Sequence, residues 1–444
     1  MKFEKLNFDY ILENLDISSK LGKKRVKEIQ FTNDSLFLEK EFFNLEVVIN
    51  LLEKNPKIYS VMKRKLSNLK DISSILERLI NGYVLDDVEL FEIKIFSMIS
   101  QEMYELLKEN YKDLAPQNLE KVIDILDPDK IRIASFHIYN SYSIELSQIR
   151  DKIKETKDES LYDKEIELED NVRKFISKKL LNYNQVLKSS IKRLGYLDFV
   201  FAKAQIANKL NLVKPTFANK TKIVGMFNPK VLKSLEEKER VYQKVDISLG
   251  KRVTVITGAN MSGKTLTLKT LGLIQVMAQT GFFVSAESAE LQLLDDICLS
   301  IGDSQSLEEG LSSFAAEMLE IDGIVKKIKK GVRPLVLIDE LARTTNPEEG
   351  RALLKSVVKI LDRYSIEAII TTHYDDIGKD VTKLRVVGIK KDILLESVDY
   401  KNIEDYIDYS LVEVDDGDVP EEALTIAKLL KIDDEIIKNA YEYL

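Results

Sequence analysis

The sequence predicts an α + α/β fold: a domain of long helices over residues 1–218, followed by an α/β domain with a mostly parallel sheet over residues 219–444. Apolar residues recur at three- and four-residue spacing through the first half, as amphipathic helices require. After Pro215, short β-branched runs alternate with helical segments, which is typical of a parallel sheet covered by helices. Gly and Pro number only 17 and 8, which argues against a loop-rich all-β protein.

Two long helices are expected near the end of the first domain, one over 131–156 and the other over 167–211. The polar stretch between them reads as a turn or a solvated tip. The pattern therefore predicts a short antiparallel coiled-coil hairpin near residues 131–211.

The second domain is expected to alternate strands with helices. Strands are predicted at 253–258, 297–303, 335–340 and 367–373. Helices are predicted at 263–281, 312–330 and 348–364, with two short C-terminal helices separated at Asp433–Asp434.

Composition excludes several classes of protein. The net charge is -8, so the chain as a whole is not a strongly basic nucleic-acid-binding protein, although a local basic face is compatible with this charge. A single cysteine, Cys298, excludes an intramolecular disulfide framework, and two histidines leave little material for a zinc enzyme. The start has no signal-peptide pattern, and no apolar run is long enough to span a membrane. We expect a cytoplasmic protein without membrane association.

The sharpest motif is G-x-x-x-x-G-K-[ST] over residues 258–265, directly after a predicted strand and opening a predicted helix. Glycines let the backbone wrap phosphates, and N–H groups at the helix start point at negative charge. Lys264 is expected to reach the β- and γ-phosphates, and the Thr265 hydroxyl to bind Mg²⁺. The predicted nucleotide-binding residues here are Gly258, Ala259, Asn260, Met261, Ser262, Gly263, Lys264, Thr265 and Leu266.

A second motif is the apolar strand that ends in Asp339-Glu340. Its position places Asp339 on the Mg²⁺ side of the site and Glu340 where it orients or deprotonates the attacking water. The two motifs together predict that the chain binds ATP with Mg²⁺ and hydrolyses it.

Three weaker motifs accompany these. Residues 309–318 open a helix, with Ser312 or Ser313 at the cap. A polar loop over 342–350 follows the Asp-Glu pair, and Thr371-Thr-His373-Tyr374 ends a strand. A histidine there serves either a structural or a catalytic role, and the pattern alone does not decide between them.

The order GANMSGKT, EEGLSSFAAEM, LVLIDELARTTNPEEG and TTHY resembles the ATPase domain of the MutS family. Upstream, residues 197–217 and 68–79 resemble the core domain of that family, with its lever helices. The resemblance implies a MutS-core-like helical domain, an ABC-type P-loop NTPase domain, and a homodimer formed through the ATPase domains.

The resemblance also implies roles for single residues. Ser312 matches a serine that reaches the ATP of the opposite subunit, and the loop 343–346 matches a segment at the dimer interface. His373 matches a switch histidine near the γ-phosphate, and Tyr242 is a candidate for the aromatic residue that stacks on adenine. Glu340, His373 and Ser312 are thus the predicted catalytic residues, and Thr265 and Asp339 the metal ligands.

Two clients remain open. The first is DNA, on which the chain would act in mismatch repair or recombination without recognising mismatched bases itself. Residues Phe37-Leu-Glu39 match the Phe-x-Glu motif that recognises mismatches, but they lie inside an amphipathic helical pattern, so we interpret the match as a coincidence. Basic residues that could contact DNA, or simply form a solvated helix face, are Lys178, Lys179, Lys188, Lys192 and Arg193. The second client is a protein: the acidic segment within 408–430 looks similar to MutS-like subunits proposed as reactivases of adenosylcobalamin-dependent lysine 5,6-aminomutase.

Overall fold

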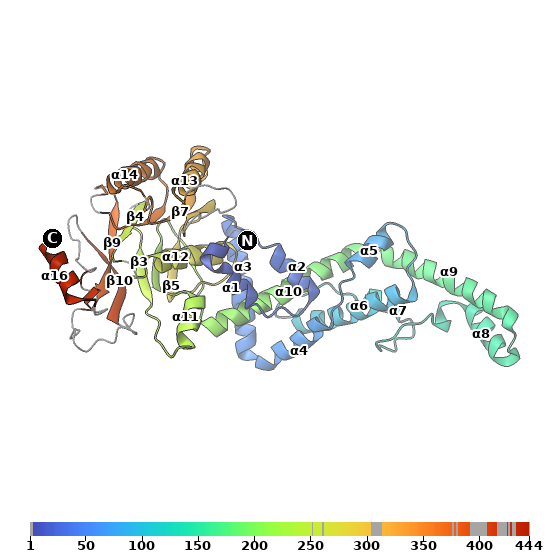
Figure 1. Ribbon diagram of the computed structural model, residues 1–444. Coiled ribbons are helices and arrows are strands. Elements are labelled where there is room, and N and C mark those ends of the chain that lie inside the picture. Colours follow the sequence, from blue (N-terminus) through green and yellow to red (C-terminus); the bar gives the residue numbers. More distant parts are fainter. Residues whose placement is uncertain are drawn as a thin grey trace. The chain divides into compact units, whose positions relative to one another are not determined.

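The computed structural model describes most of the chain, in two compact units (Figure 1). The first unit comprises residues 1–14, 30–42 and 206–444, and the second comprises 15–29 and 43–205. The described residues are 3–250, 252–259, 262–302, 313–343, 345–374, 377–378, 381–390, 406–414, 424, 427–428 and 432–443. Among these residues, no helix combines the length and apolarity needed to cross a membrane.

Among its described residues, the second unit contains helices and no strands, as the apolar spacing predicts. Its helices are α2 (Lys20–Lys27), α3 (Ser35–Lys54, shared with the first unit), α4 (Pro56–Ser67), α5 (Ser73–Ile80), α6 (Asp87–Leu107), α7 (Glu120–Leu126), α8 (Ile144–Thr156), α9 (Tyr162–Leu181) and α10 (Asn184–Leu210, also shared). Helix α6 starts with a capping box, in which the Asp86 and Glu89 side chains each accept from the other residue's N–H.

The two long helices predicted near the end of this unit are shorter than expected. The first begins only at Ile144, because the chain reverses before it: Lys130 and Arg132 have positive φ, and the Arg132 N–H donates to the Asp127 carboxylate at 2.7 Å. The second is two helices, α9 and α10, which break at 182–183. Helices α8 and α9 do pack against each other. The extent of a coiled hairpin and the domain boundary near residue 218 stay predictions.

A six-stranded sheet forms the core of the first unit, with strand order β10-β9-β4-β8-β7-β6. Every neighbouring pair is parallel except β9–β10, so the sheet is mostly parallel, as predicted. Its strands are β4 (Val253–Thr257), β6 (Asp296–Ser300), β7 (Pro334–Asp339), β8 (Ala368–Thr371), β9 (Thr382–Ile389) and β10 (Ile407–Glu413).

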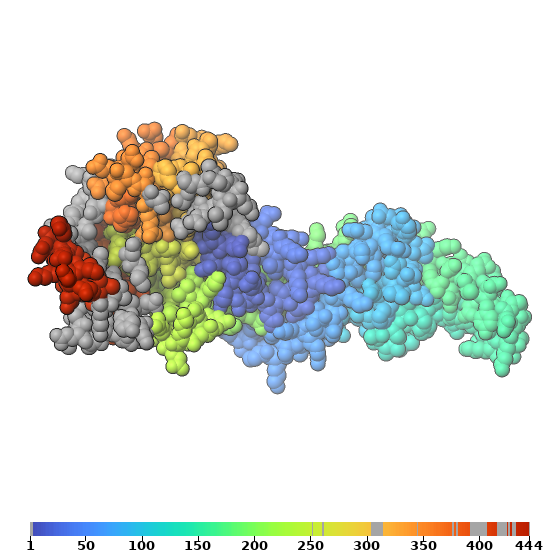
Figure 2. All heavy atoms as spheres, in the orientation of Figure 1, coloured from blue at the N-terminus to red at the C-terminus, as the bar shows by residue number. Residues whose placement is uncertain are grey.

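Helices cover both faces of this sheet (Figure 1). Apolar residues of α13 (Ser313–Lys329) and α14 (Pro347–Arg363) form one buried cluster with alternate residues of β4, β7 and β8. Helix α12 (Lys264–Gln279) contacts β7 and β8, and its Gly272 is so close to Leu337 that a Cβ there would lie 2.6 Å from Leu337 Cδ1. The outer side chains of α13 and α14 lie at the surface in Figure 2.

A second, four-stranded sheet was not expected from the sequence. Its order is β1-β5-β2-β3, and only the β1–β5 pair is parallel. The strands are β1 (Thr216–Phe217), β2 (Lys222–Met226), β3 (Val245–Ser248) and β5 (Ser288–Leu291). Other α-helices among the described residues of this unit are α1 (Phe8–Glu13), α11 (Pro229–Glu236) and α16 (Asp434–Glu442), which Asp433 caps.

One acid is buried where β8 begins. Glu367 is 6% exposed, and neither of its carboxylate oxygens has a hydrogen-bond partner among the described residues. Burial raises the pKa of Glu367 from 4.5 to about 7, and the hydroxyl of Thr221 offsets part of the effect. Between about pH 4.5 and 7, the folded protein therefore holds a proton here that the unfolded chain releases.

This burial predicts a pH-dependent cost. The folded pKa of Glu367 is raised, so the unfolded chain binds fewer protons between pH 4.5 and 7 and stability falls as pH rises through that window. The full cost, above pH 7, is on the order of 3 kcal/mol. Glu367→Gln should remove it, and chemical denaturation should show a larger gain at pH 8 than at pH 5. An equal gain at both pH values would contradict the raised pKa.

Candidate active site

The predicted phosphate loop lies between the end of β4 at Thr257 and the start of α12 at Lys264. Gly263 has φ +82, which an L side chain rarely adopts, and a Cβ there would lie 2.9 Å from the ring of Tyr409. Glycine is therefore needed both for the turn into the helix and for the approach of that ring. Ser262 is buried, whereas Asn260 and Met261 lie outside the described residues.

Lys264 folds back over this loop. Its ammonium group donates to the carbonyl oxygens of Gly258 and Ala259, each at 2.8 Å, and the side chain is only 4% exposed. Glu340 Oε1 lies 3.6 Å from the same nitrogen. The structure thus holds a buried positive charge beside the N-terminus of α12, where it favours an anion.

Asp339 joins three elements at the end of β7. The Thr265 hydroxyl, in the first turn of α12, donates to its two oxygens at 2.8 and 3.1 Å. The Thr371 hydroxyl, at the end of β8, donates to Oδ1 at 2.5 Å. Thr265 and Asp339 were predicted as metal ligands, and the structure brings these two oxygen donors together. Hydroxyl and carboxylate oxygens are ligands that suit Mg²⁺.

Glu340 follows in a constrained conformation, with φ +52. Its N–H donates to the carbonyl and to the hydroxyl of Thr371, at 3.0 and 3.1 Å. Its carboxylate lies between Lys264 and Arg343, whose guanidinium is 3.1 Å from Oε2. The predicted base is therefore next to the predicted phosphate-binding lysine.

Hydrogen bonds to the backbone of Ala342, two residues after Glu340, connect three of the sequence motifs. Glu317 of α13 accepts the Ala342 N–H with both carboxylate oxygens, at 3.2 Å, and burial raises the pKa of Glu317. The Tyr374 hydroxyl donates to the Ala342 carbonyl at 3.4 Å. A Cβ at Gly350 would lie 2.3 Å from that hydroxyl. Ala342 itself has φ +59, so these contacts hold an unfavourable backbone conformation in place.

A cavity of about 240 Å³ lies beside the phosphate loop. Tyr242, Gly263, Leu266 and Tyr409 are among its lining residues, together with apolar residues of β2 and α11. The Tyr242 hydroxyl accepts the Asn228 N–H at 3.0 Å, and burial raises the pKa of Tyr242. The cavity therefore places two aromatic side chains, Tyr242 and Tyr409, beside the predicted phosphate loop.

Sequence reasoning missed Tyr409, Glu317 and the hydroxyl of Thr371 as parts of this site. Tyr409 is on β10, far along the chain, and no motif marks it; Gln243 positions it by accepting its N–H at 3.2 Å. Glu317 belongs to the motif over residues 309–318, and this membership is the sequence signal that could have pointed to its contact with Ala342. Thr371 likewise opens the TTHY motif.

Of the other two predicted catalytic residues, His373 is described by the structure and Ser312 is not. His373 is exposed two residues after β8 ends, and its ring centroid lies 4.4 Å from that of Tyr374. Ser312 lies outside the described residues, as does Thr344 in the loop 343–346. Asn346 caps α14 by accepting the Glu348 N–H at 2.8 Å.

Comparison with known proteins supports the resemblance of this domain to the MutS family. Residues 254–444, which contain the whole cluster around Lys264 and Asp339, match the family MutS domain V. The α/β part of the chain is thus similar to domain V of the MutS family.

Relatives from several bacteria carry the name Endonuclease MutS2. The chain is 27% identical to that of Caldanaerobacter subterraneus subsp. tengcongensis, over 99% of the chain and 63% of the relative. It is 32% identical to that of Caldicellulosiruptor bescii, over 81% and 45%. It is 36% identical to that of Thermus thermophilus, over 47% and 27%. The chain spans less than two-thirds of each relative. None of these names supports the aminomutase reactivase alternative.

Proposed function

We propose that the chain is an ATP hydrolase that requires Mg²⁺ and acts on DNA. The observation that carries the hydrolase proposal is the convergence of Lys264, Thr265, Asp339 and Glu340 at one edge of the sheet. Thr265 and Asp339 would hold the Mg²⁺ ion, which would neutralise charge on the β- and γ-phosphates. The name of the MutS2 relatives and the domain V match support this choice.

The residues of the chain have distinct tasks in this proposal. Lys264 exchanges the carbonyls of Gly258 and Ala259 for phosphate oxygens, and the N–H groups at the start of α12 bind the same phosphates. Glu340 orients a water molecule and accepts its proton as that water attacks the γ-phosphate. Tyr242 and Tyr409 flank the cavity that would receive adenine.

A basic groove in the helical unit supports DNA as the client. The groove, about 780 Å³ in volume, is lined by Lys24 and Arg25 of α2 and by Lys188, Lys192 and Arg193 of α10. Three of these cations have partners: Lys24 pairs with Asp71, Arg25 with Glu28, and Arg193 donates to the Ala115 carbonyl.

Lys188 and Lys192 are exposed one helical turn apart and form no ion pair among the described residues. Glu28 and Glu77 also line the groove, so five cations face two acids. This excess of positive charge suits a phosphate backbone.

The active unit in this proposal is a homodimer through the ATPase domains, with ATP binding and hydrolysis moving the lever helices. Ser312 and the loop 343–346 would come from one subunit to the ATP of the other, and His373 would act near the γ-phosphate. A phosphate loop grips the nucleotide from one side, which leaves the other side of the γ-phosphate open to such a partner.

Lys264→Ala should abolish tight ATP binding, because it removes the buried charge that neutralises the terminal phosphates. Lys269→Ala, on the same helix but outside the loop, is the matched control and should bind normally. Titration with a fluorescent ATP analogue measures both. Unchanged affinity in Lys264→Ala would refute the phosphate-loop assignment.

Glu340→Gln should bind ATP with near-normal affinity and turn it over about 10²–10⁴-fold more slowly, because the amide accepts no proton from water. Glu348→Gln, at the exposed start of α14, should leave the rate unchanged. Steady-state phosphate release gives the comparison. A near-normal rate in Glu340→Gln would show that Glu340 is only a neighbour of the metal ligand.

Replacing Lys188 and Lys192 together with Gln should weaken duplex DNA binding. It should also lower the slope of log K against log salt by about 2, since each neutralised phosphate contributes about 0.9. Lys329→Gln/Lys330→Gln carries the same charge change on the first unit and should have little effect. Binding titrations between 50 and 200 mM salt test this. Equal slopes for both double variants would exclude the groove as a DNA contact.

A further inference from the structure

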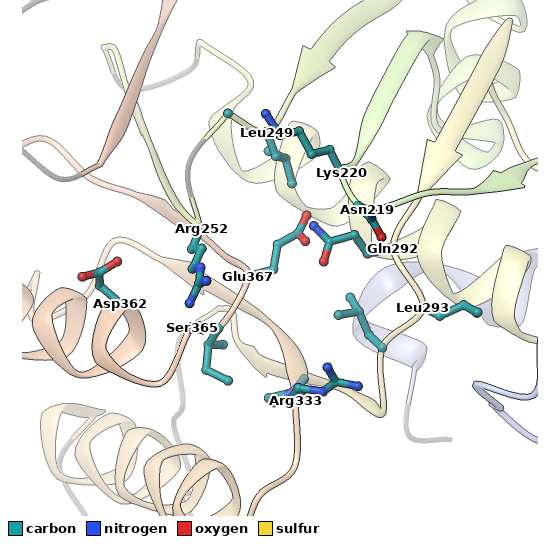
Figure 3. Close-up of a pocket in the computed structure, with 14 residues that line it drawn as sticks. Asn219, Lys220, Leu249, Arg252, Gln292, Leu293, Arg333, Asp362, Ser365 and Glu367 are labelled. Carbon is teal, nitrogen blue, oxygen red and sulfur yellow. The ribbon is translucent and has the colours of Figure 1, made fainter.

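A second cavity lies at the opposite ends of the strands that carry the phosphate loop (Figure 3). Its volume is about 660 Å³, within the range of small-molecule sites. Arg252 and Glu367 line it from the residues just before β4 and β8, whereas Gly258 and Thr371 stand at the far ends of these strands. The cavity is therefore separate from the candidate active site.

The floor of this cavity carries a buried acid. Glu367 is 6% exposed, and neither of its oxygens forms a hydrogen bond among the described residues, although the Thr221 hydroxyl is near enough to offset part of the rise in its pKa. In Figure 3 its side chain lies amid the lining residues, between Arg252 and Gln292. A buried carboxyl group without partners costs free energy, and a ligand that donates to it would recover part of that cost.

The rim of the cavity is positive. Lys220, Arg252 and Arg333 are exposed there, and none of the three forms an ion pair with another described residue. Asp362 is the acid on the rim. Three cations facing one rim acid favour a ligand that carries negative charge at the cavity mouth.

These two features together restrict the ligand. A carboxylate can accept two parallel N–H bonds from one edge of a ligand. Guanidinium and amidinium groups offer such an edge, but their positive charge would meet the three rim cations. The guanine base offers N1–H and the N2 amino group without a charge, and the phosphate of its nucleotide suits arginine.

We propose that this cavity binds a guanine nucleotide, with the base edge on Glu367 and the phosphate at Arg252 and Arg333. Lys220 adds a further positive charge at the mouth, and the Gln292 amide is a second polar group beside the base. The raised pKa of Glu367 means that binding releases its proton near neutral pH. The proposal does not depend on ATP hydrolysis at the other end of the strands.

GMP is the probe, because it lacks the β- and γ-phosphates that a phosphate loop grips. Calorimetric titration of the full chain should show one saturable site, and excess ATP should not displace GMP from it. IMP lacks only the N2 amino group and should bind about 10-fold or more weakly, the discrimination expected for losing half of a bidentate contact. Guanosine should also bind more weakly, because it lacks the phosphate.

Variants then assign the two ends of the ligand. Glu367→Gln should lose the preference for GMP over IMP, since an amide oxygen is a poorer acceptor for two donors. Arg333→Ala should weaken GMP binding and leave guanosine binding unchanged. Arg351→Ala, exposed on α14 outside the cavity, is the charge-matched control. Normal ATP binding and a single cooperative unfolding transition show that each variant is folded.

The proposal would be overturned by no GMP binding at millimolar concentration, by equal binding of GMP and IMP, or by a GMP preference that survives in Glu367→Gln. Displacement of GMP by ATP would also overturn it, because it would place GMP in the phosphate loop. If Lys264→Ala binds ATP normally but the GMP results hold, the hydrolase proposal fails and this one stands.

Discussion

The carboxylate of Asp339 is the point on which the candidate active site depends. It ends a fully buried strand, yet accepts hydroxyl groups from α12 and from β8. The parallel register places Asp339 beside Thr371, and Thr371 beside Ile256 of the strand before the phosphate loop. Backbone pairing therefore fixes these groups before any nucleotide binds, which is the kind of rigid support that a catalytic arrangement needs.

The residues after Asp339 show how a loop is held in an unfavourable conformation. Glu340 and Ala342 both have positive φ, which costs non-glycine residues about 1–3 kcal/mol each when the surroundings enforce it. Thr371 fixes the N–H of Glu340, while Glu317 and Tyr374 fix the N–H and carbonyl of Ala342. Three motifs that are separate in sequence thus serve one purpose, which is to aim Glu340 at Lys264.

The sequence predicted β4, β6, β7 and β8 and the helices that cover them closely, because short apolar runs and three- and four-residue helical spacing are local signals. It did not predict β9 and β10 of the same sheet. It predicted the helix from 131 wrongly, because the hydrogen bond from Arg132 to Asp127 that reverses the chain leaves no mark in apolar spacing. The four-stranded sheet escaped prediction because its strands have two to five residues and pair across long sequence separations. Tyr409 was missed for the same reason: only β-sheet pairing brings β10 near Gly263.

Asp339 and Glu367 show how much the surroundings decide what a carboxyl group does. Both lie at ends of neighbouring parallel strands, β7 and β8, and both are largely removed from water. Asp339 accepts from two hydroxyl groups, whereas Glu367 forms no hydrogen bond among the described residues, and burial raises its pKa to about 7 despite the nearby Thr221 hydroxyl. A protein that only needed to fill space at position 367 could use an apolar side chain without that cost. A ligand that donates hydrogen bonds to the Glu367 carboxyl group would offset the free-energy cost of burying it. The adjoining cavity gives such a ligand access.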